Sequence, residues 1–187
     1  MKPSILLLSA ALAWPFAAMA DHVTVNFTAR VLTSSGTRPP VGATFTGAYV
    51  FDSNPAAYTQ WPDPTLPGYL GYETFASTYG LTMQWPSGPI DFTQGGGVTV
   101  EVFDNGTSSY PLPVAGDATL FGVKRSNVIY RLSLFGPATS FTGSALPTEP
   151  WLSGQWTSGT FTIRDQNIFS TVLTAEIIGT SVSSLPD

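Results

Sequence analysis

The chain has 187 residues, of which seven are basic and twelve are acidic, and its formal net charge at neutral pH is −5. Nucleic acid is not an expected partner, because phosphate backbones are bound by clustered Lys and Arg side chains. The sequence contains no cysteine and one histidine, His22, which excludes disulfide frameworks and zinc sites built from Cys and His. A Ser-His-Asp triad would depend on His22, which lies close to the expected mature N-terminus, where chains fray.

The first twenty residues have the layout of a secretory signal peptide. Lys2 gives the charged start, an apolar stretch runs from Ile5 to Ala18, and Ala18-Met19-Ala20 forms a small-residue cleavage site. The apolar stretch of about fourteen residues is too short for a stable membrane span. We therefore predict cleavage after Ala20, export to the periplasm or the extracellular space, and a single mature domain of residues 21–187. A retained N-terminal membrane anchor is the alternative interpretation.

Strand patterns recur along residues 21–187. The clearest is a period of two, in which polar residues separate Val23, Val25, Phe27, Ala29 and Val31. Further runs rich in Thr, Val, Ile, Phe and Tyr lie at 43–51, 72–85, 90–93, 98–103, 118–124, 128–135, 155–164 and 171–182. Several strands separated by turn signals predict an all-β domain, and we expect a single antiparallel β-sandwich of jelly-roll-like topology.

Turn residues separate these runs. The strongest hairpin signal is Asp104-Asn105-Gly106, and further turns are expected at Ser35-Gly36, Asp52-Ser53-Asn54-Pro55, Pro86-Ser87-Gly88-Pro89 and Ser126-Asn127. Two long proline-rich loops are predicted at 55–67 and 137–150, a length typical of functional or disordered segments. A closed outer-membrane barrel is the alternative architecture, although many runs are short for it and sixteen prolines occur in the chain.

The sequence has few side chains of the types that act in catalysis, so we do not expect an enzyme. A glycoside hydrolase needs only two carboxylates, and this is the enzyme class left open. The spacing marks no pair among its candidates, Glu73, Asp91, Glu101, Asp117 and Asp165. The segments Asp52-Ser53-Asn54 and Asp104-Asn105 are interpreted as ordinary turns, with Ca²⁺ binding as the alternative. We therefore predict no catalytic residue, no metal site and no cofactor.

Aromatic residues in and beside the long loops are the best candidates for ligand contact. Exposed Trp and Tyr rings can stack on the apolar faces of sugars. Core packing is the competing interpretation of the same rings. The predicted ligand-binding residues are Tyr58, Trp61, Tyr69, Tyr72 and Trp151.

Three segments carry a resemblance to a known class of proteins. The run from Gly42 to Asp52, the run Gly159-Thr160-Phe161-Thr162-Ile163 and the closing run from Ile177 to Val182 resemble strands of exported bacterial proteins of the PEP-CTERM class. The resemblance implies an envelope-associated or matrix-associated β-sandwich and transfers no catalytic residue. The sorting tail that defines the class, with its Pro-Glu-Pro motif and apolar span, does not follow Val182, so we expect a released protein.

These observations predict a secreted, non-enzymatic binding or extracellular-matrix module. Its expected partners are polysaccharide or other envelope components, contacted through the loop aromatics, with no membrane span after signal cleavage. Two alternatives stay open: a two-carboxylate glycoside hydrolase, and a structural subunit that assembles through sheet edges.

Overall fold

The computed structural model describes residues 21–186 except 37, 67, 76–78, 94–96, 107–115, 139, 141–142, 144 and 147–155. The predicted signal peptide lies outside the described residues. In chain order the elements are β1 (Asp21–Ser34), β2 (Thr44–Asp52), the 3-10 helix η1 (Pro55–Ala57), β3 (Thr59–Pro62), β4 (Tyr69–Thr74), β5 (Gly80–Trp85), β6 (Gly88–Asp91), β7 (Gly97–Gly106), β8 (Gly116–Arg125), β9 (Val128–Gly136), β10 (Ser158–Asp165) and β11 (Ser170–Pro186).

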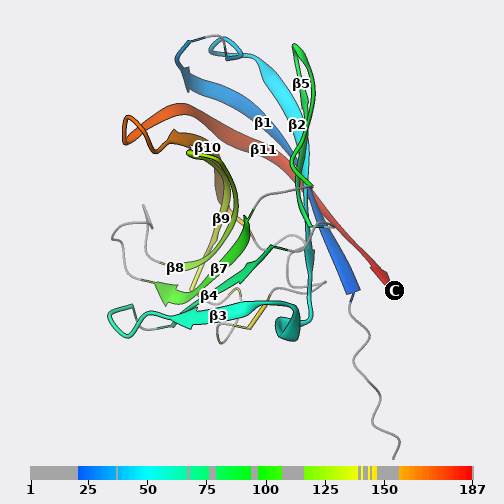
Figure 1. The fold of residues 1–187 in the computed structure, drawn as a ribbon, viewed down its shortest axis with the longest axis vertical. Helices are drawn as coiled ribbons and strands as arrows, with labels where there is room; N and C mark the ends of the chain where they lie inside the picture. Colours follow the sequence, from blue (N-terminus) through cyan, green and yellow to red (C-terminus); the bar gives the residue numbers. More distant parts are fainter. Residues whose placement is uncertain are drawn as a thin grey trace, which may run out of the picture.

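All of these strands belong to one antiparallel sheet. Neighbouring strands follow the order β3-β4-β7-β8-β9-β10-β11-β1-β2-β5-β6, and the sheet curls into a half-barrel (Figure 1). The predicted all-β, antiparallel architecture is confirmed. The predicted sandwich of two packed sheets with jelly-roll topology is not what the described strands form, because β1 and β11 pair along most of their length and join the two halves of the chain.

Side chains, rather than ladder hydrogen bonds, close the curl. The Tyr49 hydroxyl on β2 lies 2.8 Å from the carbonyl oxygen of Thr99 on β7 and 3.0 Å from that of Gly122 on β8. The ring of Phe121 on β8 packs against Tyr49 and Phe51 at centroid distances of 5.0 Å and 5.5 Å. The curled sheet therefore wraps around its own core.

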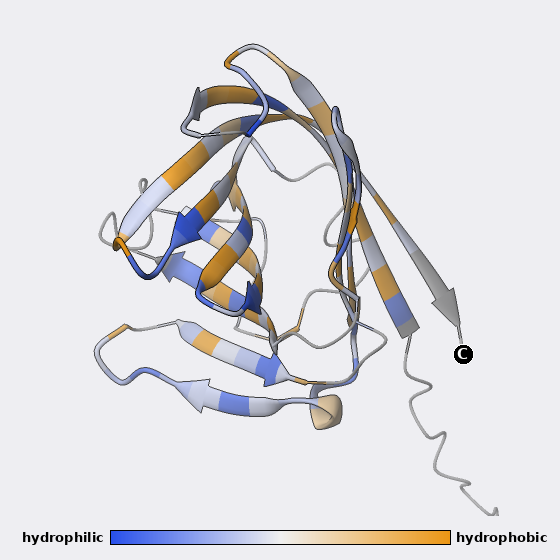
Figure 2. Ribbon diagram, turned by 45° about the horizontal axis from the view of Figure 1, so that its top comes forward, coloured by the Kyte–Doolittle hydropathy of each residue, from blue (hydrophilic) through white to orange (hydrophobic). Residues whose placement is uncertain are grey.

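The alternation predicted for the first strand places its apolar residues in that core. Val23, Val25, Phe27, Ala29 and Val31 are all buried, and hydropathic alternation is visible along the strands in Figure 2. We call the face that lines this core the inner face and the opposite one the outer face. Because side chains alternate between faces, the residues between these positions lie on the outer face.

The predicted turns are partly confirmed. Pro86-Ser87 and Ser126-Asn127 connect paired strands as two-residue loops. The tight hairpin expected at Asp104-Asn105-Gly106 is wrong, because β7 continues through Gly106 and its pairing with β8 shifts register there. At this register shift Asn105 has a positive φ of 55°. Its backbone N–H donates a hydrogen bond of 2.9 Å to the Asp117 carboxylate.

The predicted loop at 55–67 contains regular structure. Pro55–Ala57 forms η1, capped by the Asn54 side chain, and Thr59–Pro62 forms the edge strand β3. Among the described residues no helix is long and apolar enough to cross a membrane.

Candidate functional site

Two of the predicted ligand-binding aromatics are packed inside the protein. Tyr58 and Tyr72 are only 8% and 2% exposed, and their rings meet edge-on at 6.1 Å. Tyr58 also stacks on Tyr79 at 6.2 Å, and its hydroxyl accepts a hydrogen bond from the Asp52 N–H at 2.9 Å. Burial raises the pKa of Tyr58 well above its ordinary value. The structure therefore places these two rings away from any ligand at the surface.

The Asp52 carboxylate organises this buried cluster. The Tyr79 hydroxyl donates to Asp52 Oδ2 at 2.7 Å, and the Asn54 N–H donates to Asp52 Oδ1 at 2.7 Å. These bonds are those of a turn that anchors η1 to the core, in agreement with the turn interpretation of Asp52-Ser53-Asn54. Among the described residues no group of three His, Cys, Asp or Glu is placed to hold a metal ion.

Trp61 and Tyr69 form a coupled pair on the outer face. Trp61 Nε1 donates to the Tyr69 hydroxyl at 2.7 Å, and the Tyr69 ring packs on Phe103 at 4.8 Å. The indole lies over Gly71, where an added Cβ would be 2.2 Å from the ring. Burial and the nearby charge of Glu101 raise the pKa of Tyr69 to about 12, and the Trp61 hydrogen bond opposes this shift. Both rings are half-buried, so part of each remains accessible.

Of the five predicted site residues, the structure thus brings Trp61 and Tyr69 together on one surface. It separates them from Tyr58 and Tyr72, which lie in the core. Trp151 lies outside the described residues.

The outer face beside this pair carries its own apolar cluster. Phe103 on β7, Ala118 and Leu120 on β8, and Phe135 on β9 are buried there, covered by Leu66 and Tyr69. In β8, residues 116–123 are all buried, without the alternation of a half-buried strand. A strand buried on both faces requires something packed on each of them.

An ion pair lies at the centre of the same face. Arg131 on β9 reaches across β8 to Glu101 on β7, with 3.0 Å between Nη2 and Oε1. Its register partner on β8 is Gly122, which has no side chain to block the approach. Burial raises the pKa of Glu101, and the Arg131 charge opposes this shift without cancelling it. The Arg131 Nε is buried and has no hydrogen-bond partner among the described residues.

Two hollows flank Arg131 on the outer face. The first, which we call the Tyr69 hollow, has a volume of about 370 Å³ and is lined by Asp63, Thr65, Leu66, Tyr69, Glu101, Phe103 and Arg131. The second, the Arg164 hollow, has a volume of about 330 Å³ and lies over β8, β9, β10 and β11. Arg131 lines both, so they form one band across the sheet.

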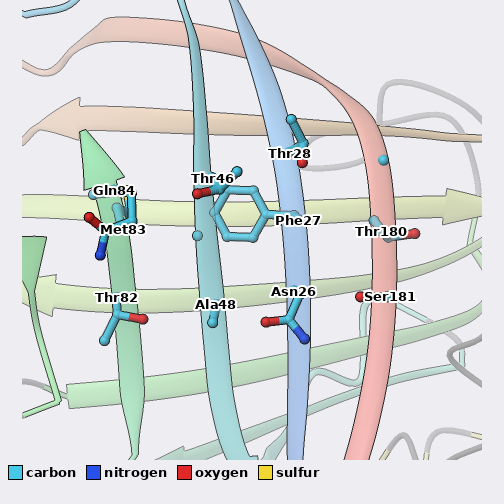
Figure 3. A pocket seen from close by; sticks show the side chains of 12 residues that line it. Asn26, Phe27, Thr28, Thr46, Ala48, Thr82, Met83, Gln84, Thr180 and Ser181 are labelled. Atoms are coloured by element: carbon cyan, nitrogen blue, oxygen red, sulfur yellow. The ribbon is translucent and has the colours of Figure 1, made fainter. Parts of the chain in front are cut away.

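A third hollow lies over another part of the sheet. It has a volume of about 490 Å³ and is lined by residues of β1, β2, β5 and β11, without a charged side chain. Asn26, Thr28, Thr46, Thr82 and Gln84 present amides and hydroxyls there (Figure 3). We call it the polar hollow. No site was predicted there, although alternating polar positions in the first two predicted strands were a sequence signal for a polar face.

Three of the other carboxylate candidates, Asp91, Asp117 and Asp165, accept backbone hydrogen bonds. Asp91 and Asp165 each accept the backbone N–H of the residue two positions later, Thr93 and Asn167, as turn residues do. Asp117 is buried and accepts from Asn105. Glu101 is thus the one predicted carboxylate that lines a hollow of this band.

Comparison with models of protein families, with curated proteins and with solved structures finds no match to this chain.

Proposed function

We propose that this chain is an exported, non-enzymatic binding or matrix module that contacts polysaccharide through the outer-face band beside Trp61 and Tyr69. The observation that carries the proposal is a rigid aromatic pair, of which one ring, Tyr69, lines an amphipathic hollow and the other, Trp61, is hydrogen-bonded to it. Tyr69 is fixed by Phe103 on one side and by the Trp61 hydrogen bond on the other. Sites for small ligands combine apolar surface with a few fixed polar groups, as this band does.

The Trp61 and Tyr69 side chains are already held in place, so they would lose little conformational entropy when a ligand binds. Trp61 is held over Gly71, and its hydrogen bond restricts rotation of both rings. Leu66 and Phe103 supply apolar surface in the Tyr69 hollow, while Asp63, Thr65 and Glu101 supply acceptors or donors for sugar hydroxyls. The resemblance to PEP-CTERM proteins supports an envelope or matrix setting.

Retention on polysaccharides tests the proposal. Wild-type protein, Trp61→Ala and Phe169→Ala would be compared on a glycan array and on insoluble polysaccharides. Phe169 is the control aromatic because it is 80% exposed and lies in the turn between β10 and β11, away from β3 and β4 in the strand order. Loss of one stacking ring should weaken binding roughly 2-fold to 10-fold. No retention of wild type on any glycan, or equal loss in both variants, would contradict the proposal.

Glycoside hydrolysis is a second candidate function, favoured by one observation. Asp63 and Glu101 line the same hollow, and their environments move their pKa values in opposite directions. Hydrogen bonds from Thr65 lower the pKa of Asp63, while burial raises that of Glu101. Such a split is what an acid and a base in one site require. Release of reducing ends that disappears in both Asp63→Asn and Glu101→Gln would favour hydrolysis over binding alone.

Assembly through a sheet edge is the third candidate. The pairing of β11 with β10 reaches Glu176, whereas the pairing of β11 with β1 continues to Pro186. Ile178 lies on this extension and is 52% exposed. If the extension pairs with a second copy, sedimentation velocity should show concentration-dependent dimers that Ile178→Lys abolishes. Leu32→Lys, at another exposed apolar residue, is the control; wild type that sediments as a monomer throughout would contradict assembly.

A further inference from the structure

The Arg164 hollow differs from its neighbours in charge. Arg131 and Arg164 both line it, and its other lining residues are uncharged: Leu120, Ile129, Ser133, Phe135, Thr160, Thr162, Thr171 and Thr174. The chain as a whole carries a net charge of −5. The lining of this hollow thus contains two arginines and no acidic side chain.

The strand register brings the two arginines close together. Arg131 on β9 lies opposite Thr162 on β10, and Arg164 follows two residues later on the same face. Diagonal neighbours of this kind have Cα atoms roughly 7–8 Å apart, within reach of long side chains. An anion over Thr162 would thus have Arg131 beside it on β9 and Arg164 beside it along β10.

Arg131 is only partly neutralised by its protein partner. It donates through Nη2 to Glu101 Oε1, a residue that lines the Tyr69 hollow and not the Arg164 hollow. Its Nε is buried without a partner among the described residues. A guanidinium has five N–H donors in a planar fork, so donors remain beyond the one that Glu101 uses.

The rest of the lining suits a sugar better than a bare ion. Ser133, Thr160, Thr162, Thr171 and Thr174 offer hydroxyl groups that can both donate and accept. Leu120, Ile129 and Phe135 offer apolar surface in the same hollow. A sugar ring has this combination of hydroxyl edges and apolar faces, and an anionic substituent would meet the arginines.

We propose that the Arg164 hollow binds sugar units bearing an anionic group, a carboxylate first among them, so that the polysaccharide recognised by the band is an acidic one. This inference rests on the proposed carbohydrate-binding function and names its ligand class. Arg131 holds the anionic group from β9, and Arg164 holds it from β10.

Calorimetric titration with an oligogalacturonate, and with a neutral galactose oligomer of the same length, tests the inference. The acidic oligomer should bind at least tenfold more tightly, and its affinity should fall as salt is raised. Arg164→Gln should remove most of that preference, and Arg131→Lys, which keeps charge but loses the fork, should reduce it. Arg30→Gln is the charge-matched control, because Arg30 pairs with Glu176 outside the hollow.

The outcomes separate this inference from the function on which it rests. Equal binding of both oligomers, unchanged in Arg164→Gln, would overturn the inference and leave carbohydrate binding standing. Failure of both oligomers to bind would overturn the inference, and failure on every other glycan would remove the proposed function as well. Competition by inorganic phosphate or sulfate as strong as that by the oligogalacturonate would also overturn it, because the hollow would then recognise charge without the sugar.

Discussion

The indole Nε1 of Trp61 donates a hydrogen bond of 2.7 Å to the hydroxyl oxygen of Tyr69 and thereby joins β3 to β4 on the outer face. Tyr69 in turn packs on Phe103 of β7. An edge strand of four residues is thus coupled through two aromatic side chains to the middle of the sheet. Binding at this surface should depend on the position of the indole as well as on its presence.

Displacing Trp61 without removing it tests this dependence. Gly71→Ala would place a Cβ 2.2 Å from the indole, so the ring must move away from β4 and its hydrogen bond to Tyr69 should break. We expect retention on polysaccharide to fall as far as in Trp61→Ala, and the Trp fluorescence maximum to shift. Thr59→Ala, an exposed change on the same strand, is the control. Gly71→Ala with full retention would show that the indole position is irrelevant.

The hydrogen bonds of the Tyr49 hydroxyl, which close the curled sheet, should contribute to the free energy of unfolding. Tyr49→Phe removes the hydroxyl that bridges β2 to the carbonyls of Thr99 and Gly122. Leaving buried carbonyls without this donor should cost about 1–3 kcal/mol in the free energy of unfolding. Urea titration of the purified variant measures this cost, while glycan retention should be unchanged. A variant as stable as wild type would mean that the bridge contributes nothing to closure.

Core packing at the β1–β2 pair predicts a second stability effect. The Phe27 ring covers Gly47, where a Cβ would lie 2.4 Å from the ring, and Phe27 also stacks on Phe161 at 5.5 Å. Gly47→Ala should therefore force the ring off its neighbour at a cost of about 1–3 kcal/mol. Thermal unfolding should show the loss as a lower Tm. The matched control is Gly179→Ala, whose Cβ would lie 3.9 Å from its nearest neighbour, the Cβ of Thr28, and whose backbone is not in the positive-φ region.

The raised pKa of Glu101 predicts how the free energy of unfolding changes with pH. Because burial raises its pKa in the folded state, the folded protein holds this proton more tightly than the unfolded chain does. Its contribution to stability is therefore present at low pH, and it is lost as pH rises from the ordinary glutamate pKa of about 4.3 through the raised folded value. Asp63 and Asp91, whose pKa values are lowered, give the opposite slope.

The contribution of Glu101 to this pH dependence is obtained by comparing the wild-type protein with the Glu101→Gln variant. Urea unfolding of wild type and Glu101→Gln between pH 4 and pH 7 should show the stability of wild type declining relative to the variant as pH rises. The slopes of Asp63 and Asp91 cancel in this comparison because both proteins contain them. A difference that stays flat, or grows in favour of wild type with rising pH, would show that Arg131 outweighs burial.

The local pattern of apolar, polar and turn residues was sufficient to predict many of the strands and turns. The alternation from Val23 to Val31 predicts a half-buried strand because one of its faces lines the core along its whole length. Two-residue turns such as Ser126-Asn127 were predictable because Asn and Ser accept the required backbone angles, and Ser126 has a φ of 52°. These features depend only on neighbours in sequence.

The features that could not be predicted from the sequence depend on pairing between strands that are distant in the chain. The single curled sheet was not predicted in place of a sandwich, because the β1–β11 ladder pairs residues as distant in sequence as Val23 and Ser184, and no local pattern encodes that pairing. Tyr58 and Tyr72 looked equivalent to Trp61 and Tyr69 in sequence, yet η1 and the alternation of β4 send them into the core. The hollows beside Arg131 depend on the register of four strands, which residue spacing within each strand does not fix.

Amide and indole chemical-shift mapping tests most directly whether the outer-face band beside Trp61 and Tyr69 contacts carbohydrate. Isotope-labelled protein would be titrated with the oligogalacturonate. We predict that the perturbed signals include the Trp61 indole and amides around Arg131 and Arg164, while the Trp85 indole stays unmoved. Perturbations confined to the polar hollow around Asn26 and Thr46, or none at saturating oligomer and with other glycans, would contradict the claim.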